Sequence, residues 1–201
     1  MLYFLGTIKK KAMSTLLVHD TRLIGSTPRH LADSSLVVGG GTLIGSLINN
    51  IMSVADRQGT ALDTVMIMCH GFQGSGESQQ HQASYGALGF GLHLCREGLT
   101  LRNVDRTYPL WGYMNNIVLY ACGPANTHPF ATGTIGDGSR FCSYLAAYTN
   151  ANVYASSETQ YYTNGNYDNI DRVCEDVPID FGGWEGHVYQ FTPDGSVYQV
   201  Q

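Results

Sequence analysis

The sequence predicts an α/β fold with a largely parallel central sheet. Two continuous apolar runs of strand length, residues 65–69 and 117–121, are typical of strands that are covered on both faces. Segments with helical periodicity flank these runs, so strands and helices alternate along the chain. Residues 186–200 alternate apolar and polar side chains around Pro193-Asp194-Gly195, which predicts a C-terminal β-hairpin.

The first half of the chain supplies a strand, a loop and a helix. Residues 14–20 are expected to form the first strand, and the polar stretch 21–41 is expected to be a loop. Apolar pairs then recur about every four residues over 42–55, which predicts an amphipathic helix that ends at Gly59. After the strand at 65–69, the glycine-containing stretch 86–101 is expected to be extended or a hairpin, with the start of a helix as the alternative.

The second half supplies another helix and a third buried strand. Asp137 or Ser139 is expected to cap a helix that continues to about Thr149. Residues 152–156 are then expected to form a strand. These elements fit a single domain over residues 14–201.

Composition excludes several classes of function. The chain has 201 residues and a formal net charge of -5, and its few basic residues form no basic face, so a nucleic-acid partner is not expected. No apolar run reaches the roughly 18 residues that span a bilayer, so no membrane partner is expected either. Residues 1–13, MLYFLGTIKKKAM, lack the order of a signal peptide and are interpreted as an N-terminal extension or a cloning remnant.

Five cysteines without a CxxC motif argue against a zinc site and against a disulfide framework. Reduced thiols and a cytoplasmic location are therefore expected, with export as an effector left open. Cys69 is expected to point away from its neighbour His70 and into the core, because successive strand residues face opposite sides. Cys95 and Cys142 are also expected in the core, whereas Cys174 lies in a polar stretch.

Two further patterns carry less weight. No metal-ligand spacing is found among His19, His81, His93, His128 and His187, and no metal or cofactor is expected. His128 is kept as an alternative partner for Cys122. The stretch VVGGGTLIG at 37–45 resembles a phosphate-binding turn but lacks the Lys-Ser/Thr of a P-loop, so a plain helix entry is favoured.

The chemistry is expected at two strand ends. His70 follows one buried strand and Cys122 follows the other, and each directly precedes a glycine. In open parallel sheets ligands bind beyond the carboxyl ends of the strands. A cysteine nucleophile needs an imidazole and backbone N–H donors for the oxyanion, and Gly71 and Cys122 itself are the predicted donors. The plain alternative is a buried thiol and an ordinary hydrogen-bonded histidine.

An apolar strand ending in His-Gly and, 52 positions later, one ending in Ala-Cys resemble the caspase-like (clan CD) cysteine peptidases, in particular their bacterial members. The similarity covers about residues 64–157. It implies a caspase-like three-layer sandwich and a cysteine endopeptidase that cleaves a protein or peptide substrate through a thioacyl-enzyme. It also implies His70 as the base or imidazolium partner, Cys122 as the nucleophile and Gly71 in the oxyanion hole. The strand end Ser156, Ser157 and Glu158 would line the pocket for the residue before the cut.

The chain departs from caspases around the cysteine. It reads Tyr120-Ala121-Cys122-Gly123-Pro124 where caspases have Gln-Ala-Cys-Arg-Gly, which argues against aspartate specificity. An acidic residue such as Asp137, Glu158 or Asp168 could instead select a basic side chain. The expected protein is a stand-alone bacterial enzyme, with an effector role by analogy. A non-catalytic scaffold of the same fold and a Cys-His acyltransferase or other non-peptidase hydrolase are the alternatives.

Overall fold

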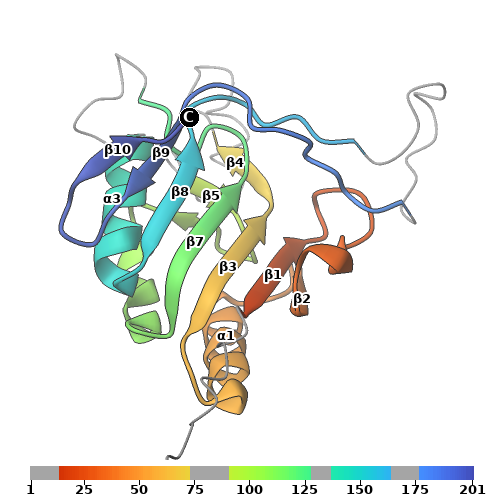
Figure 1. Ribbon diagram of the computed structural model, residues 1–201. Helices are drawn as coiled ribbons and strands as arrows, with labels where there is room; N and C mark the ends of the chain where they lie inside the picture. The colour runs from red at the N-terminus through yellow and green to blue at the C-terminus, as the bar shows by residue number, and fades with distance from the viewer. Residues whose placement is uncertain (1–13, 73–90, 128–136, 164–176) are drawn as a thin grey trace, which may run out of the picture.

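A computed structural model describes residues 14–72, 91–127, 137–163 and 177–201. Its centre is a seven-stranded sheet with the order β10-β9-β8-β7-β3-β1-β2 (Figure 1). The strands are β1 (Thr15–Asp20), β2 (Ser34–Val38), β3 (Leu62–Met68), β7 (Met114–Tyr120), β8 (Asn152–Ser156), β9 (Val188–Phe191) and β10 (Val197–Gln199). The five strands from β2 to β8 are parallel and the last two are antiparallel, which confirms a largely parallel sheet.

A small second sheet lies at the carboxyl ends of the parallel strands. It consists of β4 (His70–Phe72), β5 (Gly91–His93) and β6 (Leu99–Thr100), all antiparallel. Strand β4 begins two residues after β3 ends, and His70 pairs with His93 across the ladder. The extended or hairpin conformation expected for 86–101 is confirmed over its described part, 91–101.

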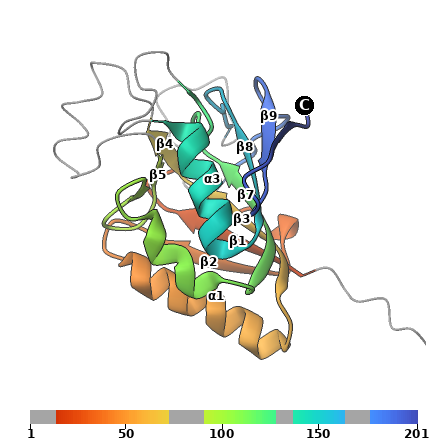
Figure 2. The ribbon, with the colours of Figure 1, turned by 90° about the vertical axis from the view of Figure 1, so that its left-hand side faces the viewer.

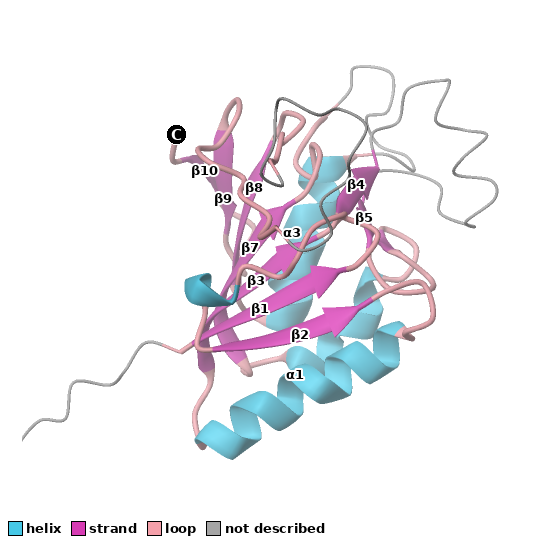
Figure 3. Cartoon of the chain, turned by 90° about the vertical axis from the view of Figure 1, so that its right-hand side faces the viewer, coloured by secondary structure: helices cyan, strands magenta, loops and turns pink. Residues whose placement is uncertain are grey.

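The two α-helices in the described part of the chain pack on one face of the large sheet (Figures 2 and 3). They are α1 (Ile44–Gln58) and α3 (Gly138–Thr149), with the 3₁₀ helix η2 (Val104–Leu110) between them. Side chains from the sheet and from these helices form one apolar core; its members include Leu16, Ile67, Ile117, Val153, Ile44, Ile51, Phe141 and Leu145. The predicted helix ends are confirmed: Gly59 closes α1 in a left-handed conformation, and the Asp137 side chain accepts the N–H of Arg140.

Coil segments cover part of the opposite face. A second apolar cluster there contains Leu17, Leu23, Met68, Ile179 and Phe181. The segment after β8 and the segment before β9 run together across this side, joined by a bridge between Thr163 and Asp180 (Figure 1). A second bridge, between Ser26 and Pro178, ties them to the loop after β1. The architecture is compatible with a three-layer α/β sandwich.

The prediction that residues 21–41 form a loop is wrong in part. A 3₁₀ helix, η1 (Arg29–Leu31), and the edge strand β2 form there. Strand β2 pairs with β1 alone and remains half exposed, with Val37 50% accessible. An exposed edge strand of this kind does not need a continuous apolar run, which is the pattern that predicted the buried strands. The C-terminal hairpin is confirmed, and its turn places Gly195 at φ +89°.

Candidate active site

The ends of β3 and β7 meet through main-chain contact between Gly71 and Cys122. A methyl group placed on Gly71 would lie 2.8 Å from the Cys122 nitrogen and still closer to its carbonyl oxygen. Only glycine fits such a close approach of two backbones. The sequence therefore brings His70 and Cys122, the two predicted dyad residues, to the same edge of the sheet.

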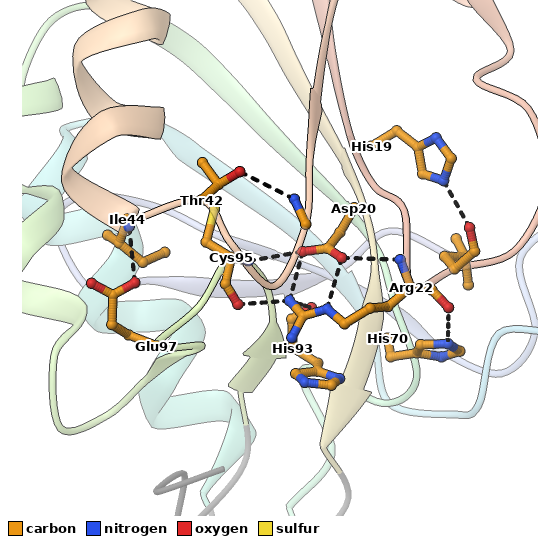
Figure 4. A network of polar contacts seen from close by, with 11 residues as sticks. His19, Asp20, Arg22, Thr42, Ile44, His70, His93, Cys95 and Glu97 are labelled. Carbon is orange, nitrogen blue, oxygen red and sulfur yellow. Dashed lines mark hydrogen bonds and ion pairs between the residues drawn. The ribbon is translucent and has the colours of Figure 1, made fainter.

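The His70 ring is oriented by a main-chain carbonyl. Its Nε2–H donates to the carbonyl oxygen of Arg22, 3.0 Å away, which leaves Nδ1 as the ring nitrogen that can accept a proton (Figure 4). Among the described residues no hydrogen bond joins His70 to the Cys122 side chain. Catalytic hydrogen bonds of this kind often tighten only when substrate is bound.

The side chain of Arg22 holds in place the main-chain carbonyl of the same residue, to which His70 donates. Its guanidinium forms two hydrogen bonds with the Asp20 carboxylate, at 2.8 and 2.6 Å, and also donates to the carbonyls of His93 and Cys95, at 3.0 and 2.7 Å. The Cys95 N–H donates to Asp20 as well, at 2.8 Å. Burial alone would raise the pKa of the fully buried Asp20, but the hydrogen bonds from Arg22 and Cys95 outweigh it and lower the pKa. The end of β1 is thus fixed to the small sheet that carries His70.

His19 fixes the other side of the same loop. It is 2% exposed, and its Nε2–H donates to the Leu23 carbonyl at 2.8 Å (Figure 4). Its Nδ1 lies 2.9 Å from the Thr27 hydroxyl. His19, Asp20 and Arg22 were not predicted as site residues. The available signal was a His-Asp pair at the carboxyl end of the first strand, the same sheet edge as His70.

Cys122 differs from the other described thiols in its exposure. Cys69, Cys95 and Cys142 are buried, as predicted, whereas Cys122 is partly exposed. Burial raises the pKa of Cys69 well above its usual value, raises that of Cys95 to about 12, and raises that of Cys142 further. These three thiols are therefore protonated and inert near neutral pH.

The chain after Cys122 continues the ladder between β7 and β8. The Gly123 N–H donates to the Glu158 carbonyl at 2.9 Å, and the Ala125 N–H donates to the Ser156 carbonyl at 3.0 Å. Gly123 adopts φ +52°, the sharp turn expected after the thiol. Its N–H is thus occupied, whereas within the described structure the Cys122 N–H donates to no backbone carbonyl.

The predicted pocket residues have unequal positions. Ser156 is fully buried; its hydroxyl donates to the Glu185 carbonyl at 2.6 Å and accepts the Glu158 N–H at 3.0 Å, so it holds the chain after β8 in place. Ser157 is partly exposed and Glu158 is exposed. Both line a surface groove with Asn126 and Ser139, beside the chain that leaves Cys122.

The other sequence candidates that the structure describes do not join this site. Glu97 accepts the N–H of Ile44 at 3.0 Å, so a carboxylate already occupies the helix entry at 37–45 that a phosphate would need (Figure 4). The Asp137 carboxylate caps α3. His187 bonds with Gln199 on the exposed hairpin. His81, His128, Asp168 and Cys174 lie outside the described residues.

Burial, together with the Arg22 charge, lowers the pKa of His93 to about 4. His93 is therefore neutral at physiological pH, and its carbonyl serves as one of the anchors of Arg22.

Comparison with known proteins finds no match: no family model, no curated protein and no solved structure is significantly similar to the chain. In the part of the chain that the structure describes, no group of three or more His, Cys, Asp or Glu side chains could hold a metal ion. None of the described helices is both long and apolar enough to cross a bilayer.

Proposed function

We propose that the protein is a cysteine endopeptidase of the caspase-like type, with His70 and Cys122 as its dyad. The observation that carries the proposal is the main-chain contact between Gly71 and Cys122, which unites the His-Gly and Cys-Gly strand ends at one edge. Two further observations support it. Cys122 is the partly exposed thiol among four described cysteines, and the Arg22 carbonyl orients the His70 ring.

In the first half of the reaction the Cys122 thiolate attacks the carbonyl carbon of the substrate peptide bond. The new C–S bond forms as the carbonyl electron pair moves to oxygen, and the N–H groups of Gly71 and Cys122 are the proposed donors to that oxyanion. Collapse of the tetrahedral intermediate breaks the C–N bond. The leaving amine takes a proton from Nδ1 of the His70 imidazolium, and a thioester remains on Cys122.

The second half releases the acyl group. Water attacks the thioester carbonyl as His70 takes its proton, and the C–S bond breaks to give the carboxylic acid and free Cys122. The bond from Nε2 to the Arg22 carbonyl leaves Nδ1 as the ring nitrogen that gives the proton in the first half and takes one in the second.

A peptide library tests this function. We expect the wild-type protein to cleave a subset of peptides, detected by mass spectrometry, and the Cys122→Ala and His70→Ala variants to leave the same peptides intact. Cys142→Ala is the matched control, because that thiol is fully buried. Cleavage that survives Cys122→Ala would remove Cys122 from the mechanism, and no cleavage by any protein would favour a scaffold or acyltransferase role.

A further inference from the structure

A groove lies on the face of the large sheet that the two described α-helices leave free. It has a volume of about 420 Å³, within the range of roughly 300–1,000 Å³ that is typical of ligand sites. Strand β7 forms its floor, and neither α1 nor α3 packs over that part of the sheet (Figure 1). We call it the sheet-face groove; its lining residues are Thr64, Asn116, Val118, Tyr120, Tyr154, Trp184, Val188, Val200 and Gln201.

Strand alternation builds the floor of the sheet-face groove. Asn116, Val118 and Tyr120 occupy alternate positions of β7, so their side chains point to the same face of the sheet. The residues between them belong to the apolar core on the helix side. On the neighbouring strand β8, Tyr154 lies directly beside Val118. The two strands therefore present a row of partly exposed side chains on this face.

Three aromatic rings give the groove flat apolar surfaces. The rings of Tyr120 and Trp184 are stacked, with their centroids 4.8 Å apart and their planes inclined by 19°. Tyr154 adds the third ring, and all three side chains are partly exposed. Tyrosine and tryptophan supply a large contact area and lose little conformational entropy when a ligand binds. The rings therefore favour a ligand that has flat, apolar ring faces of its own.

The same three side chains also offer hydrogen-bond donors. The hydroxyls of Tyr120 and Tyr154 and the indole N–H of Trp184 make no hydrogen bond with any residue that the structure describes. None of the three polar atoms is enclosed, so each stays accessible. An indole N–H can only donate, and a phenol hydroxyl donates readily. The groove thus favours a ligand that is rich in acceptors.

The charge of the lining restricts the ligand further. None of the nine described lining residues has a charged side chain. A charged ligand would lose water in the groove and gain no opposite charge in return, which costs free energy. An uncharged ligand matches this lining.

A proline-rich peptide segment combines these properties. Its pyrrolidine rings are apolar and can pack on aromatic faces, and its carbonyl oxygens accept hydrogen bonds. Proline has no N–H, so the segment needs few acceptors from the groove. It is also extended before it binds, in the polyproline II conformation, and so loses little entropy; aromatic-lined grooves recognise such segments in other proteins.

We propose that the sheet-face groove binds an uncharged, proline-rich segment of a partner protein. The inference goes beyond the peptidase activity and does not depend on it. Tyr120, at one end of the groove, is two residues before Cys122 on the same chain segment. A protein held by this groove is therefore brought to the sheet edge that carries the proposed dyad.

Tryptophan fluorescence tests the binding directly. The chain contains two tryptophans, and Trp111 is not among the lining residues, so Trp111→Phe leaves Trp184 as the single indole. We titrate this variant with acetylated, amidated decaproline and expect a saturable blue shift of the emission. A matched decamer in which every second proline is alanine should bind at least about fivefold more weakly, because it loses ring contacts and gains N–H groups that need acceptors.

Variants of Tyr154 locate the site. In the same background, Tyr154→Phe keeps the ring and removes the donor, so binding should weaken by about two- to tenfold, the value of one hydrogen bond. Tyr154→Ala should weaken it by at least about tenfold, as expected for an aromatic anchor. Tyr161→Ala is the matched control, because this tyrosine is 71% exposed and is not among the lining residues, and it should bind as tightly as the parent.

The possible results decide the inference independently of the dyad. No saturable change up to about 1 mM decaproline would overturn it. Equal affinity for the two decamers, or for folded Tyr154→Ala and its parent, would overturn it too. Tighter binding of cellohexaose than of decaproline would assign the groove to a saccharide instead. Cys122→Ala should bind decaproline normally, so an inactive dyad would leave this site intact. If Tyr154→Ala does not fold, Tyr154→Phe and the two decamers decide.

Discussion

Gly71 rests directly on the main chain of Cys122, so a Cβ at this glycine would lie 2.8 Å from the Cys122 nitrogen. The contact joins two segments that are 51 residues apart in sequence (122 − 71). It also explains why a glycine follows the histidine. The backbone of β4 must pass over the end of β7 before the chain turns into the small sheet.

Gly71→Ala is expected to separate the two strand ends. The added methyl group meets backbone atoms that cannot rotate away, so the free energy of unfolding should fall by about 2 kcal/mol or more. Chemical denaturation measures the change. Gly45→Ala is the matched control, because a Cβ there meets nothing within 4 Å and alanine favours a helix, so stability should rise by about 0.5 kcal/mol. Equal, small effects at the two positions would contradict the described contact.

Removing the Arg22 side chain is expected to cost both stability and thiol reactivity. Arg22→Ala leaves the fully buried Asp20 without its cation, which should lower the free energy of unfolding by about 3 kcal/mol. Arg22→Lys should recover part of this loss, because it keeps the charge and loses the forked geometry. The labelling rate of Cys122 at pH 6 should fall with the same ranking, since the Arg22 carbonyl orients His70.

Arg106→Ala is the control for that variant. Its ion pair with Glu97 is 3.6 Å long and largely exposed, so its loss should change stability by less than about 1 kcal/mol and leave Cys122 unaffected. A Cys122 labelling rate in folded Arg22→Ala that equals the wild-type rate would show that the loop after β1 does not position the base.

Stability is expected to fall as the pH drops from about 6.5 to about 4. Burial lowers the pKa of His93 to about 4, so over this interval the unfolded chain binds a proton that the folded chain excludes. After allowance for partial exposure, the loss should be about 1–2 kcal/mol. His93→Asn should flatten the profile in this interval, and His30→Asn, at an exposed position, should not.

Asp20 contributes to the free energy of unfolding over a lower pH interval than His93 does. Its pKa is lowered in the fold, so its stabilising effect is present above its ordinary pKa near 3.8 and is lost as the pH falls below that value. Denaturation curves measured every half unit from pH 3 to pH 8 would resolve the two intervals. A flat wild-type profile between pH 4 and pH 6.5 would contradict a half-buried, neutral His93.

The elements that the sequence predicted correctly are those whose signals are local. Apolar runs, the helix stop at Gly59, the cap at Asp137 and the C-terminal turn depend on neighbouring residues alone, and each is confirmed. Strand β2 was missed because its stability comes from pairing with β1 and from little side-chain burial. Such an edge strand has no pattern of its own.

Of the candidate site, only the side chains that directly follow a strand could be predicted from the sequence. His70 and Cys122 follow buried runs, and the parallel topology brings such ends together. The Arg22 carbonyl could not be predicted, since every residue has one. The role of Ser156 could not be predicted either, because the sequence does not distinguish a buried hydroxyl that bonds to main-chain groups from an exposed one.

Alkylation of Cys122 at low pH tests the central claim most directly. Iodoacetamide labelling is followed by peptide mapping at pH 6 in the wild type and in His70→Ala, with free cysteine as the reference thiol. If His70 stabilises a thiolate, wild-type Cys122 should react at least about tenfold faster than free cysteine, and His70→Ala should remove the acceleration. A wild-type rate no higher than that of free cysteine, or a rate unchanged by His70→Ala, would contradict the dyad.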